Sequence, residues 1–359
     1  METWKQLMRE SITSPEELAG ILDVDVSEIT TVNDAFPLRA NHYYLSLIRK
    51  KGDPIWKQVI PDIRELSGEG HDDPLHEEHD SPVACITHRY PDRVLFYVSA
   101  TCALYCRFCT RKRKVSDPSS VSDREIQNGI DYIREHTEIR DVVVSGGDPF
   151  MLSDENIDSI LSRLRAIPHV QILRVGTRVP VTLPQRITKG LCAILEKHHP
   201  LFINTHFNHP REITPESKAA CGMLSAAGIP IGNQTVLLKG VNDDPKTMKE
   251  LMHRLLMIRV KPYYIYQADL VKGTKHFRTS ISKGLEIIRS LRGFTSGLAV
   301  PHYVIDAPGG GGKIALIPNP VIRETENEII LKNFEGNRYA YPSKVRDVFI
   351  PQFIEEVSL

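Results

Sequence analysis

Six short apolar runs, rich in β-branched residues, recur along the chain. They lie at Val94–Val98, Val142–Ser145, Ile172–Gly176, Phe202–Thr205, Ile231–Leu237 and Lys261–Gln267. Each is followed by an amphipathic segment of helix length, at Ser122–His136, Ser153–Ala166, Leu183–Lys197, Thr214–Ala227, Asp244–Ile258 and Ser280–Arg292. From the second run onward the starts recur about every 30 residues, the length of one βα unit. The pattern therefore predicts an α/β fold with six parallel strands and helical crossovers.

Six such units are too few for a closed eight-stranded barrel. We expect an open, partial (β/α)6 TIM-like barrel over residues 93–295. Residues 1–92 predict a mainly helical lead-in, with a helix that starts at Ser14 because a capping serine precedes a proline and two acids. Within it, residues 68–82 are polar and turn-rich and predict a solvated loop. Residues 296–359, where the period stops, predict a short β-rich extension.

Polar residues stand at or near the end of each predicted strand. They are the cysteine stretch after the first, Ser145–Pro149 after the second, Gly176–Arg178 after the third, Asn204–His206 after the fourth, Asn233 and Gln234 in the fifth, and Tyr266–Asp269 after the sixth. Each alone could be a cap or a satisfied core group. The carboxyl ends of barrel strands carry the chemistry in βα barrels, so six polar ends in register indicate one ligand site.

Cys102, Cys106 and Cys109 have the spacing C-x3-C-x2-C. Three thiolates can each bind one iron of a cubane cluster and leave the fourth iron open, whereas a closed cluster or a structural zinc needs four protein ligands. An open iron suits a cluster that binds a small molecule and passes an electron to it. The alternative is a zinc site completed by a distant residue such as His88, although zinc ligands usually form two separated pairs.

Composition narrows the range of partners. The 45 basic and 45 acidic residues cancel, which gives no indication of a nucleic-acid or membrane-surface partner. The N-terminus has no apolar leader and no run approaches the roughly 18 apolar residues of a membrane span, so we expect a cytoplasmic protein. Cys85, Cys192 and Cys221 are scattered and predict buried free thiols in a reducing compartment.

The stretch Pro301–Lys313 predicts a strand that runs into four glycines and one lysine. A phosphate-binding loop would need a helix and a Ser or Thr after the lysine. Here Ile314–Pro318 is β-like instead, and Ala307 replaces the first glycine of that pattern. A flexible glycine arch better suits a lysine that forms and releases a Schiff base, as with pyridoxal 5′-phosphate (PLP).

With Phe108 just before the third cysteine, the cysteine stretch resembles the signature of radical S-adenosylmethionine (SAM) enzymes, whose open iron binds SAM. Residues 33–342 further resemble the lysine 2,3-aminomutase family, isomerases of this class that also use PLP. The matching blocks are Thr87–Phe96, Thr110–Arg113, Val144–Pro149, Pro184–Thr188, Arg259–Asp269, His276–Thr279, Tyr303–Lys313 and Asn333–Gly336. The resemblance implies a radical SAM barrel, with the PLP lysine in the C-terminal extension.

The resemblance also implies residue roles. Cys102, Cys106 and Cys109 would bind a [4Fe–4S] cluster, and Phe108, Ser145, Gly146, Gly147, Asp148, His206 and Gln234 would hold SAM. Lys313 would bind PLP covalently, with Arg89, Tyr90 and Arg93 around its phosphate and Tyr266 beside its ring. Arg111 would pair with the substrate carboxylate. In such enzymes one electron cleaves SAM, a hydrogen leaves Cβ, the nitrogen moves from Cα to Cβ, and the hydrogen returns to Cα.

Asp269 and Asp306 match positions that receive the side-chain ammonium in the lysine enzymes and that glutamate-specific relatives lack. Two neighbouring carboxylates repel unless a cation lies between them, so we expect L-lysine as the substrate. The alternatives are arginine or glutamate as substrate, β-lysine made for modifying a translation factor, and a cofactor-binding sensor without turnover. The resemblance further implies a homo-oligomer and an electron donor such as flavodoxin or ferredoxin. Longer members bind zinc through C-terminal cysteines, but no cysteine follows Cys221, so no zinc is expected.

Overall fold

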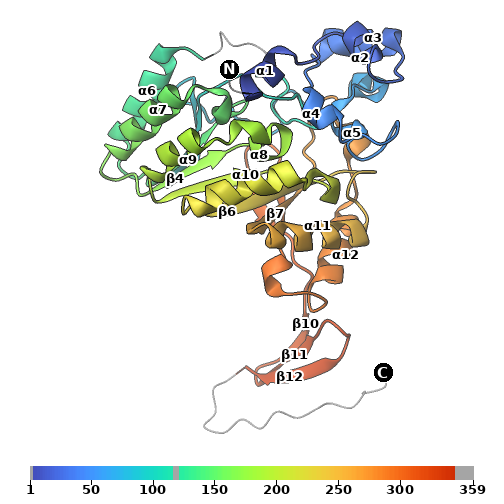
Figure 1. Cartoon of the computed structure of the whole chain (residues 1–359). Coiled ribbons are helices and arrows are strands. Elements are labelled where there is room, and N and C mark those ends of the chain that lie inside the picture. Colours follow the sequence, from blue (N-terminus) through green and yellow to red (C-terminus); the bar gives the residue numbers. More distant parts are fainter. Residues whose placement is uncertain (1–2, 116–120, 344–359) are drawn as a thin grey trace.

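The computed structural model describes residues 3–115 and 121–343, which form a curved nine-stranded sheet with helices along its outside and a separate three-stranded sheet (Figure 1). The last part of the predicted extension, residues 344–359, lies outside the described residues. The strands are β1 (Ile86–Tyr90), β2 (Arg93–Tyr97), β3 (Asp141–Ser145), β4 (Ile172–Gly176), β5 (Leu201–Thr205), β6 (Ile231–Leu237), β7 (Val260–Gln267), β8 (His302–Ala307), β9 (Gly312–Ala315), β10 (Val321–Glu324), β11 (Glu328–Lys332) and β12 (Arg338–Pro342).

The nine strands of the large sheet are ordered as in the chain, and β2 to β8 run parallel. The six predicted strands are confirmed as β2–β7. In β3 the side chains alternate between two environments. In β3, Val142 and Val144 are buried in the core against the helices, while Asp141, Val143 and Ser145 face the inside of the curve. The period of two therefore decides which side chains can reach a ligand.

Helices α6–α12 cover the convex side of the sheet (Figure 1). They are α6 (Asp123–Glu135), α7 (Asp154–Arg165), α8 (Val179–Thr182), α9 (Lys189–Glu196), α10 (Pro215–Ala226), α11 (Pro245–Met257) and α12 (Ile281–Leu291). Ser122, Ser153 and Thr214 cap α6, α7 and α10 through their side-chain oxygens. The prediction that a helix starts at Leu183 was wrong. Pro184 begins a short 3-10 turn instead, and α9 begins only at Lys189, after its cap at Thr188.

The lead-in consists of short helices followed by β1. Its helices are α1 (Thr3–Arg9), α2 (Pro15–Ala19), α3 (Val26–Ala35), α4 (His42–Leu45) and α5 (Trp56–Val59). The predicted start at Ser14 is confirmed by a capping box with Glu17. Short 3-10 turns are η1 (Ile63–Leu66), η3 (Pro149–Met151), η4 (Pro184–Arg186), η5 (Pro210–Glu212), η6 (Lys275–Phe277) and η7 (Gly297–Ala299). This region supports the cysteine stretch, because the backbone N–H of Arg107 donates to the carbonyl of Gln58 at 2.9 Å.

The edges of the large sheet lie close to one another. β1 pairs antiparallel with β2, and β9 pairs antiparallel with β8, so both carry the sheet beyond the six predicted strands. Within the described residues no ladder joins β1 to β9. A side chain bridges them instead, since the backbone N–H of Lys313 on β9 donates to the hydroxyl of Tyr90 on β1 at 2.9 Å. The predicted open barrel is thus confirmed, and its two edges meet at Lys313.

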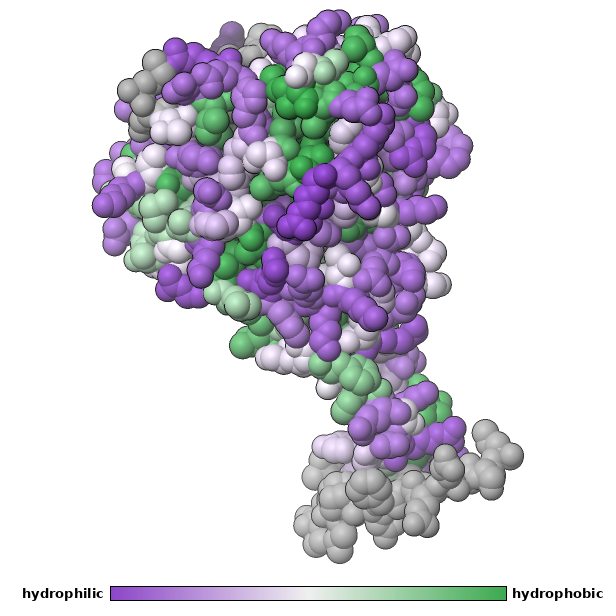
Figure 2. Space-filling view, turned by 45° about the vertical axis from the view of Figure 1, so that its right-hand side comes forward, coloured by the Kyte–Doolittle hydropathy of each residue, from purple (hydrophilic) through white to green (hydrophobic). Residues whose placement is uncertain are grey.

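Strands β10–β12 form an antiparallel sheet of their own that stands apart from the barrel (Figure 1, Figure 2). Several of its apolar side chains are exposed, among them Val321, Ile322 and Phe334. Across the described ranges, every helix is too short or too polar to cross a membrane.

Candidate active site

A cavity of about 630 Å³ opens inside the curve of the sheet, where the strands end. This volume is typical of small-molecule sites. Every residue that the family resemblance assigns to a cofactor or to the substrate lines it: Arg89, Tyr90, Arg93, Cys102, Cys106, Phe108, Cys109, Arg111, Ser145, Gly146, Gly147, Asp148, His206, Gln234, Tyr266, Asp269, Asp306 and Lys313. The fold thus collects residues from distant parts of the chain around one space.

The cysteine loop, residues 101–111, is fixed from the side of the lead-in. The guanidinium of Arg107, which is 2% exposed, donates to both carboxylate oxygens of Glu65 at 2.8 Å. It also donates to the carbonyls of Pro37 and Phe36. Glu65 is fully buried and pairs with Lys112 as well. These contacts hold the loop on both sides of Cys109, so the thiols have a defined position in the cavity wall.

The three thiols suit a cationic cluster. Burial raises the pKa of Cys109 to about 11 and raises that of Cys102 well above its usual value, so their thiolates need positive charge nearby. Iron supplies that charge. In the described ranges no three His, Cys, Asp or Glu side chains converge on a single ion. A cubane cluster does not require this, since each thiolate binds a different iron. The donor set therefore fits a [4Fe–4S] cluster.

The Ser145–Asp148 turn lies directly against the beginning of the cysteine loop. Gly146 has φ of +151°, and a Cβ at this position would lie 2.2 Å from the carbonyl oxygen of Ser99. A Cβ on Gly147 would lie 2.7 Å from the carbonyl oxygen of Thr101. Only glycine permits this approach of two backbones. The turn therefore forms a backbone-lined shelf beside the cysteines.

Asp148 is held as part of the scaffold. Its carboxylate accepts hydrogen bonds from the Thr177 hydroxyl and the Arg178 backbone N–H, both at 2.7 Å. Burial raises its pKa to about 6 despite these bonds.

His206, at the end of β5, is neutral at pH 7 because burial lowers its pKa to about 4. Gln234 on β6 lies next to it, and its backbone hydrogen-bonds to the His206 side chain. Two neutral groups thus face the cavity here.

Lys313 lies at the end of the cavity where β9 meets β1. Its Nζ is 3.0 Å from Oδ1 of Asp306 and 5.4 Å from the centroid of the Tyr266 ring. The guanidinium of Arg93 stacks on Tyr90, 3.8 Å from the ring centroid. A reactive lysine, an aromatic face and two cationic side chains, including Arg89, therefore surround this end. The set fits PLP, which has an aldehyde, a ring and a dianionic phosphate.

The charge of Asp306 acts on Asp269. Burial is the main cause that raises the pKa of Asp269 to about 7, and the negative charge of Asp306 adds to it. Lys313 partly offsets the effect. Near neutral pH the pair therefore attracts a further cation, such as the ammonium of a substrate.

Glu77 is a site residue that the sequence did not reveal. It is 8% exposed and pairs with Arg111, with distances of 2.7 Å to Nη2 and 2.9 Å to Nε from Oε1. Burial alone would raise its pKa, but the charges of Arg111, Lys114 and Arg113 lower it to about 2. Residues 71–81 are therefore a wall of the site, in contrast to the solvated loop that was expected. No local pattern could show this, because Arg111 lies far along the chain.

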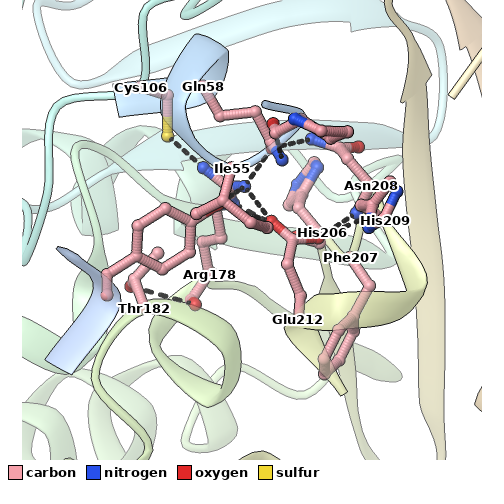
Figure 3. A network of polar contacts seen from close by, with 12 residues as sticks. Ile55, Gln58, Cys106, Arg178, Thr182, His206, Phe207, Asn208, His209 and Glu212 are labelled. Carbon is pink, nitrogen blue, oxygen red and sulfur yellow. Dashed lines mark hydrogen bonds and ion pairs between the residues drawn. The ribbon is translucent and has the colours of Figure 1, made fainter. Parts of the chain in front are cut away.

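Arg178 is the second such residue. The sequence placed it at a strand end without a role, whereas the structure buries it among polar partners beside Cys106 (Figure 3). Its neighbours come from the lead-in as well as from the barrel. Only the tertiary structure brings these segments together.

Two family models match the chain. The model described as Radical SAM superfamily matches residues 96–252, and that described as Lysine-2,3-aminomutase matches residues 288–352. The first contains the cysteine loop and β3–β6, and the second contains Asp306 and Lys313.

Curated relatives match over nearly the whole chain. The L-lysine 2,3-aminomutase of Methanococcus maripaludis is 54% identical over 353 residues, covering 95% of this chain and 82% of that protein. The L-lysine 2,3-aminomutase of Fusobacterium nucleatum is 49% identical over 362 residues, covering 98% and 85%. A glutamate 2,3-aminomutase of Clostridioides difficile is 48% identical over 340 residues, covering 93% and 81%. Identity alone thus separates the two substrates poorly.

Proposed function

The chain belongs to the lysine 2,3-aminomutase family of radical SAM enzymes, and we propose that it converts L-lysine to β-lysine. The amino group moves from Cα to Cβ, and one hydrogen moves from Cβ to Cα, so no atom is gained or lost. The observation that carries the choice of substrate is the acid pair Asp269 and Asp306, which lines the same cavity as Arg111 and Lys313.

The cavity suits three cofactors. Cys102, Cys106 and Cys109 would hold the [4Fe–4S] cluster, and Phe108, the Ser145–Asp148 turn, His206 and Gln234 would hold SAM. Lys313 would bind PLP, with Arg89, Tyr90, Arg93 and Tyr266 around it. When bound, cluster and SAM supply the one-electron chemistry that removes hydrogen, and PLP supplies a conjugated system that accepts electron density. The chain itself supplies binding, orientation and exclusion of water.

Arg111 and the acid pair fix the two ends of the substrate. Glu77 occupies the Nε and Nη2 edge of Arg111, while Nη1 lies 3.4 Å from the Ser145 hydroxyl. The second N–H of Nη1 can donate to the α-carboxylate. Asp269 and Asp306 at the other end can receive the side-chain ammonium. Holding both ends brings Cα and Cβ to one place beside the cofactors.

The cavity wall limits the entry of water. The backbone N–H of His71 donates to the carbonyl of Leu270 at 2.8 Å, and the N–H of Gly309 donates to the carbonyl of Pro74 at 3.0 Å. Residues 71–81 are thereby joined both to the end of β7 and to the glycine arch before Lys313. A reactive radical attacks nearby C–H bonds, so a wall that limits the entry of water protects the reaction.

Glutamate is the second candidate, because the Clostridioides difficile relative is nearly as similar as the lysine enzymes. The acid pair argues against it, since Asp269 and Asp306 would repel the γ-carboxylate of glutamate. Lysine brings a cation to the same place.

Several further properties form part of the proposal. Free cysteines at all six positions suit a reducing, cytoplasmic compartment. The exposed apolar residues Val321, Ile322 and Phe334 support a homo-oligomer. An electron donor such as flavodoxin or ferredoxin would reduce the cluster. We expect no zinc, and zinc found beside iron in purified protein would contradict this.

An anaerobic product assay tests the function. The protein is reconstituted with iron and sulfide and supplied with PLP, SAM and dithionite, and lysine, glutamate and arginine are offered separately. β-Lysine from lysine alone is expected. Rearrangement of glutamate instead would be consistent with the fold and the cofactors, but it would contradict the proposed role of Asp269 and Asp306.

A further inference from the structure

Arg178 contacts one of the three cluster cysteines directly. It lies just after β4 and precedes α8, and its Nη1 is 2.7 Å from Sγ of Cys106 (Figure 3). Arginine remains charged at any pH of interest. The contact is therefore a charged hydrogen bond to sulfur. Cys109 instead receives a neutral backbone N–H, from Arg111, at 3.3 Å.

The guanidinium of Arg178 is held in one orientation by partners from three other segments. Its Nη2 donates to Gln58 of α5 at 2.6 Å, to Glu212 of η5 at 2.8 Å and to the Tyr44 hydroxyl of α4 at 3.2 Å. Glu212 is fully buried and also accepts from Tyr44 at 2.6 Å. Because Nη2 is fixed on this side, the planar fork turns Nη1 toward Cys106.

Arg178 also reaches the region expected to hold SAM. Its backbone N–H donates to Asp148 at 2.7 Å, and its Nε donates to the carbonyl oxygen of His206 at 3.1 Å. One residue therefore contacts a cluster cysteine, the glycine turn and the end of β5. A chain of packed hydrogen bonds of this kind holds ligands at fixed positions.

We propose that Arg178 is a positioning residue that orients Cys106 and sets the electrostatic environment of the cluster. Hydrogen bonds to sulfur and net charge are two of the factors that set the potential of an iron–sulfur cluster. Reduction adds one negative charge, which the nearby guanidinium stabilises. The cluster should therefore be easier to reduce with Arg178 than without it. This inference rests on the proposed function, because it assumes a cluster on these cysteines.

A purely structural role is the alternative, since Arg178 balances the buried charge of Glu212. Arg178→Gln alone would leave that carboxylate unpaired and could unfold the protein. The double variant Arg178→Gln/Glu212→Gln removes both charges together. Arg178→Lys keeps the positive charge and loses the fork.

Arg186 offers a matched control. It is 1% exposed, pairs with Asp154 at 2.7 Å and donates to the carbonyl of Phe150 at 2.7 Å. In the part of the chain that the structure describes, Arg186 is not among the residues that line the cavity. Arg186→Gln therefore tests the loss of a buried arginine that is not in contact with the cysteines.

The experiment is a potentiometric titration of each reconstituted protein with dithionite. Electron paramagnetic resonance measures the reduced cluster at each potential. Substrate is left out, so there is no turnover. One electron from dithionite converts [4Fe–4S]2+ to [4Fe–4S]+. In Arg178→Gln/Glu212→Gln we expect the ratio of reduced to oxidised cluster at a fixed potential to fall about tenfold, which is about 59 mV for a one-electron couple. Arg178→Lys should restore most of the loss, and Arg186→Gln should match the wild type.

Iron content separates the possible outcomes. A folded double variant that loses iron, while Arg186→Gln keeps it, supports the positioning of Cys106. An unchanged potential at full iron content overturns the inference, and so does equal loss of iron in both variants. If the wild type itself takes up no cluster, the proposed function fails first, so the two failures can be told apart.

Discussion

The Nζ of Lys313 lies 3.0 Å from Oδ1 of Asp306. The lysine proposed to bind PLP therefore forms an ion pair with one of the two aspartates proposed to bind the substrate ammonium. Bonded to PLP, Lys313 would no longer present its ammonium group to Asp306. Asp306 is then left with Asp269, whose pKa it already raises. The pair would then attract a new cation. Loading of PLP would thereby favour a substrate with an ammonium side chain.

Removal of the amine of Lys313 should abolish covalent binding of PLP. In Lys313→Ala we expect the visible absorbance of bound PLP to disappear after desalting, while iron content remains that of the wild type. Lys283→Ala, at an exposed salt bridge with Glu286, is the control and should keep the absorbance. Absorbance retained in Lys313→Ala would place the cofactor on another lysine.

Protonation of Asp269 should limit the use of lysine in acid. Its pKa is raised to about 7, mainly by burial, so below pH 7 the carboxyl becomes neutral and attracts ammonium less. We expect kcat/KM for lysine to fall about tenfold per pH unit below this value and to level off above it. In Asp269→Asn the inflection should be missing, and kcat/KM at pH 8 should be lower by at least about tenfold, ~1.4 kcal/mol.

Two results would contradict the assignment of this inflection to Asp269. The same inflection in Asp269→Asn as in the wild type would assign it to another group. An equal effect of the substitution on SAM cleavage without substrate would point to a general defect in place of a lost contact with lysine.

Glu77 should act through Arg111. Its carboxylate accepts from Nε and Nη2 on one edge of the guanidinium, so Glu77→Gln should leave Arg111 less ordered and raise KM for lysine roughly tenfold, ~1.4 kcal/mol, with a smaller effect on kcat. Steady-state kinetics under anaerobic conditions measure this split. A lower KM would show that Glu77 competes with the substrate carboxylate and does not orient its partner.

The buried ion pair beneath the cysteine loop should contribute to stability. Glu65 is 1% exposed and serves Arg107 and Lys112, so Glu65→Gln leaves cationic charge buried without its partner. We expect the free energy of unfolding to fall by about 3–5 kcal/mol, measured by denaturant titration. Glu286→Gln, at an exposed pair, should change it by no more than about 0.5 kcal/mol. A similar small change in Glu65→Gln would contradict the importance of this pair.

Local patterns predicted the barrel well, because both the alternation of a strand and the capping of a helix depend on neighbouring residues. Val142 and Val144 alternate with cavity-lining positions in β3, and Ser122 with Glu125 forms the capping box of α6. The prediction of where α9 starts was wrong for a local reason as well. Pro184 begins a separate 3-10 turn, and the helix starts only after its cap at Thr188.

The sequence by itself determined the six strands of the barrel, the cysteine spacing and the polar side chains at the strand ends. The tertiary structure alone decided that Glu77 faces Arg111 and that Arg178 joins Gln58, Glu212 and Cys106. The physical reason is range. A period or a cap is set within a few residues, whereas a buried charge is matched by whichever group packing brings near it, however far away in the chain that group lies.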